Sequence, residues 1–96
     1  MKITLPVKTI KDGDGKDINA FLVLCGIVIE NTTQKSDAET YLVKSLRDKI
    51  DAATTELELT DGEIAELKKR FKELQDQNKV SGSIWYFFRK PLDDAK

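Results

Sequence analysis

Few side chains in this sequence could do chemistry. It contains no histidine, which removes the most common general base and the most common metal ligand. The single cysteine, Cys25, lies in an apolar run that should raise its pKa and make it a poor nucleophile. Carboxylate pairs such as Asp48/Asp51 and Glu56/Glu58 fall in patterns typical of solvated faces, whereas a catalytic pair needs a pocket that perturbs it. We therefore expect no enzyme activity, no catalytic residue, and no metal or other cofactor.

The acidic and glycine-rich segment 12–17 has some features of an ion-binding loop. Read as a calcium loop, it has carboxylates at the first, third and sixth places, but the sixth should be glycine and the twelfth is Val23 instead of glutamate. Read as a phosphate loop, it lacks the spacing to an earlier glycine and the Ser or Thr that follows the lysine. Because Asp and Gly are common turn residues, the segment predicts a surface turn.

A basic cluster in the predicted helix 61–79 could contact phosphate, and its members are Lys68, Lys69, Arg70 and Lys72. The same helix holds as many acidic as basic residues, and the whole chain has a formal charge of -1. A duplex binder usually carries a basic excess, since neutralised phosphates supply most of its affinity. Solvated ion pairs are therefore the favoured interpretation, and a small nucleic-acid-binding regulator that uses this helix is the alternative function.

An aromatic cluster near the C-terminus is the most suggestive feature. Trp85, Tyr86, Phe87 and Phe88 are consecutive, and Arg89 follows them. Neither a helix nor a strand can turn four adjacent rings toward one core, so at least one ring should stay partly exposed. Trp, Tyr and Arg dominate interface hot spots, which makes Trp85, Tyr86, Phe88 and Arg89 candidate contacts with a protein partner or a second copy. The alternative is that most of the rings close the core, since large aromatics also dominate core packing.

The elements that must position these side chains begin with an extended N-terminus. Residues 1–18 alternate in character, Pro6 is typical of an edge strand, and the Asp/Gly turn allows a hairpin. Residues 19–31 are almost all apolar, so periodicity alone cannot distinguish a buried helix from a buried strand. Their length, with Asp17 or Asn19 as an N-terminal cap, favours the helix.

Two amphipathic helices are predicted in the middle of the chain, over 37–54 and 61–78. Each is preceded by a capping box, in which a hydroxyl accepts from an amide of the first turn and a glutamate reaches back; these begin at Ser36 and Thr60. Apolar residues at helical spacing define the faces expected to be buried. They are Leu42, Leu46 and Ile50 in the first helix, and Ile64, Leu67, Phe71 and Leu74 in the second.

Residues 80–90 predict a short aromatic helix or strand, and a helix that ends before Pro91 is favoured because proline disfavours helical backbone in the preceding residue. A chain of 96 residues supports one domain, 1–96. We expect a helix-dominated α+β fold, with an N-terminal extended segment or hairpin followed by three or four helices around one core. The lone thiol suits a reducing cytoplasm, no signal peptide opens the chain, and no apolar run reaches the ~20 residues of a membrane span.

Three stretches resemble a class of short phage-encoded proteins. They are the tripeptide DGK at 14–16, LELTDGEIAELK at 57–68, and VSGSIW at 80–85. Gly62 departs from the acidic residue usual in that class. The resemblance implies a phage or prophage origin and a helical 80–90, in a class largely without assigned function.

The favoured function is a non-enzymatic, phage-type protein-interaction module. It would be an inhibitor or adaptor of a host protein, or a small virion-assembly factor. The expected partner is a protein or a second copy, with no membrane. The expected location is the cytoplasm of a bacterial host, or the virion.

Overall fold

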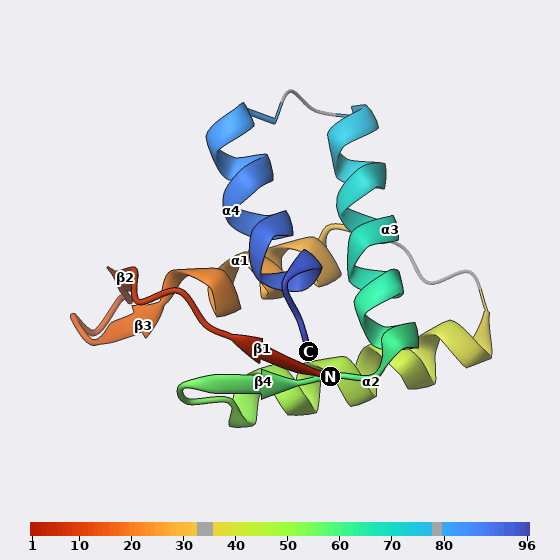
Figure 1. The fold of residues 1–96 in the computed structure, drawn as a ribbon, viewed down its shortest axis with the longest axis horizontal. Coiled ribbons are helices and arrows are strands. Elements are labelled where there is room, and N and C mark those ends of the chain that lie inside the picture. Colours follow the sequence, from red (N-terminus) through yellow and green to blue (C-terminus); the bar gives the residue numbers. More distant parts are fainter. Residues whose placement is uncertain (33–35, 78–79) are drawn as a thin grey trace.

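The computed structural model describes residues 1–32, 36–77 and 80–96, and it confirms the helix-dominated α+β class (Figure 1). Two small antiparallel sheets accompany the helices within these residues. In chain order the elements are β1 (Lys2–Thr4), β2 (Thr9–Lys11), β3 (Asp17–Asn19), α1 (Ala20–Glu30), α2 (Asp37–Ala52), β4 (Glu56–Glu58), α3 (Asp61–Gln77) and α4 (Gly82–Asp93).

The predicted hairpin is formed by β2 and β3, in which Ile10 lies opposite Ile18. Asp12 holds its turn, because the Asp12 carboxylate accepts hydrogen bonds of 2.9 Å from two backbone amides further along the turn. Gly15 completes it with a φ of 80°, in the left-handed region that favours glycine. The segment that superficially resembles an ion-binding loop is thus a turn whose leading carboxylate is engaged by the backbone.

The first strand, β1, does not join this hairpin but pairs antiparallel with β4, and Ile3 lies opposite Leu57. Both of these side chains are buried. On the other edge of β1, Lys2 and Lys96 exchange backbone hydrogen bonds of 2.6 and 3.0 Å. A small sheet therefore joins the two ends of the described chain to its middle.

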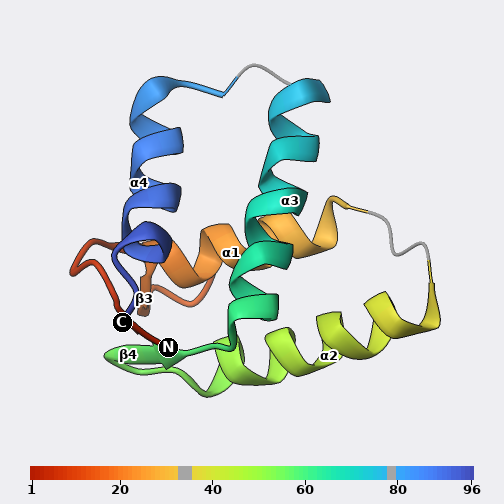
Figure 2. The same ribbon diagram turned by 45° about the vertical axis from the view of Figure 1, so that its right-hand side comes forward.

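Helix α1 lies at the centre of the fold and contacts α2, α3 and α4 (Figure 2). Its favoured helical assignment is correct, and Asn19 is the cap: the Asn19 side-chain oxygen accepts from the amides of Phe21 and Leu22 at 2.9 and 3.2 Å. Neighbours on three sides explain the continuous run of apolar residues, four of which are buried. These are Phe21, Cys25, Val28 and Ile29.

Helices α2 and α3 begin at the predicted caps. The Ser36 hydroxyl accepts from the Glu39 amide at 3.2 Å, and Thr60 and Glu63 form a reciprocal pair at 3.1 and 2.8 Å. Most of the predicted apolar faces are buried as expected, but helix α2 ends two residues earlier than predicted, at Ala52.

Two of the residues predicted to be buried, Leu42 and Leu74, are only half-buried. In α2 the neighbouring Val43 faces the core in place of Leu42. Leu74 lies in the last turns of α3, where it packs at the margin of the core. The buried apolar face of α2 is thus formed by Val43, Leu46 and Ile50, and that of α3 ends at Phe71.

Helix α4 corrects a second boundary, since it continues through Pro91 to Asp93 instead of stopping before the proline. Proline lacks an amide proton and crowds the carbonyl four residues earlier. In α4 this cost falls in the final turn, where it is offset by the complete burial of Leu92 in the core. The Asp94 amide also donates to the Lys90 carbonyl at 3.0 Å and closes that turn.

Candidate protein-contact site

Helix α4 divides the four adjacent rings between the core and the surface. Phe88 is fully buried and stacks on Phe71, with 4.3 Å between ring centroids. Phe87 is half-buried and meets Phe21 edge-on at 6.3 Å. Trp85 and Tyr86 remain exposed, by 37% and 59% of their surfaces. The structure therefore removes Phe88 from the candidate contact residues and leaves Trp85 and Tyr86.

Arg89, the fourth candidate, is engaged within the fold. Its guanidinium lies 5.3 Å from the centroid of the Trp85 ring and donates to Asp93 at 3.2 Å. Lys68 of α3 also pairs with Asp93, at 2.7 Å. The hydrogen bond from Lys68, together with Arg89, lowers the pKa of Asp93 below its usual value. This cluster links α3 to α4 and holds Arg89 beside the indole.

An apolar groove of about 710 Å³ lies between α4, α1 and the segment that leads into the hairpin. Four large apolar side chains around it, Ile10, Ile27, Ile84 and Tyr86, keep between 41% and 59% of their surfaces exposed. The complete lining is Pro6, Lys8, Ile10, Ala20, Val23, Leu24, Ile27, Ser83, Ile84, Tyr86, Phe87, Lys90 and Pro91. We call this feature the α1–α4 groove.

The helical spacing of two elements produces the α1–α4 groove. On α1, Val23 and Ile27 are one turn apart, and on α4 so are Ile84, Phe87 and Pro91. Sequence reasoning missed the α1 side of the groove because it placed this whole segment in the core. One signal was present in the sequence. A helix that is apolar on every side must pack against neighbours on every side, and a chain of 96 residues has few elements that could pack there.

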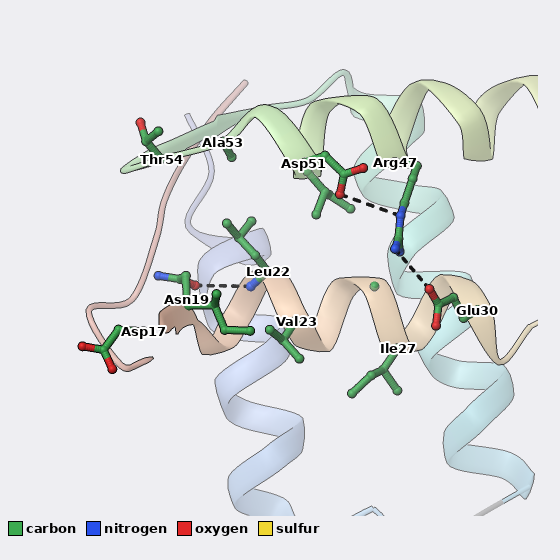
Figure 3. Close-up of a pocket in the computed structure, with 13 residues that line it drawn as sticks. Asp17, Asn19, Leu22, Val23, Ile27, Glu30, Arg47, Asp51, Ala53 and Thr54 are labelled. Atoms are coloured by element: carbon green, nitrogen blue, oxygen red, sulfur yellow. Dashed lines mark hydrogen bonds and ion pairs between the residues drawn. The ribbon is translucent and has the colours of Figure 1, made fainter. Parts of the chain in front are cut away.

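A second cleft, of about 600 Å³, lies between α1 and α2 and is drawn in Figure 3. Arg47 crosses it from α2, pairing with Glu30 of α1 at 3.1 Å and with Asp51 at 3.8 Å. Gly26 makes room for this side chain, since a Cβ there would lie 3.1 Å from an Arg47 nitrogen. The cationic group is thus matched by two carboxylates, and the arrangement fits an ion-pair bridge between two helices.

The candidate phosphate contacts are all paired with acids inside the fold. Lys68 binds Asp93 as described, Lys69 binds Glu39 at 3.1 Å, and Lys72 binds Asp76 at 2.8 Å. Arg70 is only 2% exposed, so the structure does not place it on the surface that phosphate would reach.

Arg70 instead links α3 to the first turn of α2 and to the bend that follows α1. It donates to Glu66 of α3 at 2.8 Å and to the Thr32 hydroxyl after α1 at 2.7 Å. Its second terminal nitrogen lies 3.8 Å from Glu39 in the first turn of α2. A buried guanidinium needs such partners, because an unpaired buried charge is costly.

Cys25 is enclosed in the core, and burial raises the pKa of its thiol to about 12. A thiol that stays protonated is a poor nucleophile. We therefore expect Cys25 to react slowly with a disulfide reagent at pH ~8 in the native protein and rapidly in denaturant. The two rates can be followed by absorbance, and rapid labelling of the native protein would contradict a structural role.

Glu63 is a buried carboxylate at the start of α3. Burial alone would raise its pKa, but hydrogen bonds from Lys49 at 2.6 Å, the Thr60 amide and the Ser45 hydroxyl outweigh this effect, and the pKa is lowered. The unfolded chain then binds a proton more readily than the folded one in acid. The stabilisation is complete above the unfolded pKa of about 4.3 and is lost as pH falls through the folded value.

We expect Glu63→Gln to weaken the dependence of stability on pH between about pH 6 and about pH 3. Urea midpoints measured across this range will check it. Glu58→Gln, which alters an exposed carboxylate on β4, is the matched control and should leave the parental dependence in place. Equal acid destabilisation of Glu63→Gln and the parent would show that another group is responsible.

No group of three or more metal-ligating side chains occurs among the described residues. None of the helices in the described ranges combines the length and apolar character that a bilayer crossing demands. In comparisons with protein-family models, with curated proteins and with solved structures, no match to this chain is found.

Proposed function

We propose that this chain is a non-enzymatic protein-interaction module whose contact surface is the α1–α4 groove and the exposed rings of α4. The observation that carries the proposal is the gathering of half-exposed apolar side chains from three elements around one groove. Apolar patches of this kind usually mark interaction sites, and aromatic residues dominate binding energies at interfaces. Tyr86 and Ile84 are the residues that we assign to the contact.

The finer role is a phage-type one: an inhibitor or adaptor of a host protein, or a small virion-assembly factor. This part of the proposal rests on the sequence resemblance at 14–16, 57–68 and 80–85. The nucleic-acid alternative has less support, because its four candidate bases already have acidic partners within the fold.

Tyr86→Ser tests the contact surface. We expect it to lower the free energy of unfolding by less than ~1 kcal/mol, since the ring is mostly exposed. Self-association, or capture of proteins that bind the parent, should be lost. Light scattering and quantitative pull-downs measure the two effects, and urea unfolding measures stability.

Tyr41→Ser is the matched control, because Tyr41 is the other tyrosine of the chain, is 78% exposed, and lies on α2 outside the groove. It should bind as the parent does. Ile84→Ser, a change on the groove itself, should behave like Tyr86→Ser. If both groove variants keep every interaction of the parent, the contact surface lies elsewhere.

A further inference from the structure

The charged residues that line the α1–α4 groove are all positive. Among its lining residues the charged ones are Lys8 and Lys90, and no carboxylate is present. Lys90 is paired with Asp94 at 3.0 Å. Lys8 forms no ion pair with the described residues, and its ammonium lies 5.8 Å from the centroid of the Phe87 ring. An apolar groove thus carries one uncompensated positive charge beside its aromatic wall.

Resting on the proposed function, we infer that the occupant of the α1–α4 groove is an amphipathic helix of another protein, with acidic residues beside its apolar face. Two walls of the groove are helical, and rows of side chains on crossing helices leave grooves into which a third helix can pack. The apolar face of the partner would contact Ile27 and Ile84. A carboxylate on its flank would pair with Lys8, which supplies specificity through charge complementarity.

A second copy of this chain fits the groove less well. A two-fold dimer through the same surface would place the unpaired Lys8 of both copies at the interface, and the lining has no acid to compensate them. A head-to-tail contact would need an apolar ridge elsewhere on the surface. The exposed large apolar residues outside the lining are Met1, Val7, Tyr41 and Trp85, and no two of them lie on one helix or strand, so no single element of the described chain presents such a ridge.

The test is a selection from a library of helical peptides on the full chain. Each peptide has fixed apolar residues at i, i+3, i+4 and i+7, with equal mixtures of Glu and Lys at the flanking positions. We expect the selected peptides to be enriched in Glu over Lys. One Glu-rich peptide, labelled with a fluorophore, then gives dissociation constants by anisotropy.

Matched variants locate the charge. Lys8→Glu should weaken this peptide by about tenfold, since an attraction becomes a repulsion at a partly desolvated rim. Selection on the Lys8→Glu protein should enrich Lys instead. The control Lys16→Glu makes the same charge change on the exposed hairpin turn, outside the lining, and should leave the affinity within about twofold of the parent.

Several results would overturn the inference, and they are distinguishable from failure of the proposed function. If Glu and Lys are selected equally, or if Lys8→Glu does not change the affinity for the peptide, the partner has no acidic flank, although an apolar contact is still possible. If no peptide is selected, the partner is not a helix. Loss of a parental dimer in Ile84→Ser identifies a second copy as the occupant. The proposed function itself fails only if the groove variants keep every interaction of the parent.

Discussion

Replacement of Phe88 by alanine is expected to lower the free energy of unfolding by about 3–5 kcal/mol. Phe88 is fully buried, stacks on Phe71 of α3, and lies 5.9 Å from Phe21 of α1 between ring centroids. Its ring therefore joins three helices at one point. Removing it loses the transfer energy of a large apolar side chain and leaves a cavity that three packed helices cannot fill without moving.

Urea unfolding followed by circular dichroism measures this loss. Tyr86→Ala is a sharp control, because it removes a comparable ring two positions away that lies mostly in solvent, and it should cost less than ~1 kcal/mol. The contrast between the two variants separates core from surface on one helix. A Phe88→Ala protein as stable as Tyr86→Ala would disprove the packing of α4 described above.

The second large effect is expected at Arg70. Arg70→Ala should lower the free energy of unfolding by about 3–5 kcal/mol. It leaves the mostly buried carboxylate of Glu66 without this guanidinium, and it removes the contacts with Thr32 and with the first turn of α2. Lys72→Ala, two positions away, breaks an exposed pair with Asp76 and should cost no more than ~0.5 kcal/mol. Thermal and urea unfolding of the two variants will compare them.

A double variant isolates the electrostatic part of the Arg70 effect. Arg70→Met with Glu66→Met keeps most of the side-chain volume and leaves no unpaired charge between the two positions, so it should recover much of the stability lost in Arg70→Ala. If Arg70→Ala were as mild as Lys72→Ala, the guanidinium would have to be solvated. It would then be available again as a phosphate contact.

The sequence predicted those parts of the fold that depend on local signals. Capping residues such as Thr60, and the turn at Asp12, act on amides only a few positions away, and both are found where they were expected. The pairing of β1 with β4 was not predicted, because three-residue strands carry little pattern. The passage of α4 through Pro91 was also missed, since its compensation comes from the distant contacts of Leu92.

The candidate site shows the same division. Four consecutive aromatic residues predicted that at least one ring would stay partly exposed, and the ring of Tyr86 is exposed as predicted. Which rings face the core depends on how α4 is rotated about its axis relative to α1 and α3. This rotation turns Phe88 toward Phe21 and Phe71 in the core. The position of Ile27 in the groove could not be predicted. In a segment that is apolar at almost every position, nothing in the sequence marks which side chain will be left without a packing partner.

The small β1–β4 sheet has a consequence for the order of folding. The Leu59 amide donates to the Met1 carbonyl at 2.9 Å across 58 positions of sequence. Closing so long a loop costs entropy before the strands gain any contact, and contacts of this kind slow folding. The sheet should therefore close after the helices have collapsed around α1. Pro6 and Lys8 are instead tied to the start of α1, because the Asn19 side-chain amide donates to the Pro6 carbonyl at 2.7 Å and the Ala20 amide donates to the Lys8 carbonyl at 3.0 Å. These contacts span far fewer positions of sequence, so the wall of the groove that contains Pro6 and Lys8 should form before the β1–β4 sheet closes.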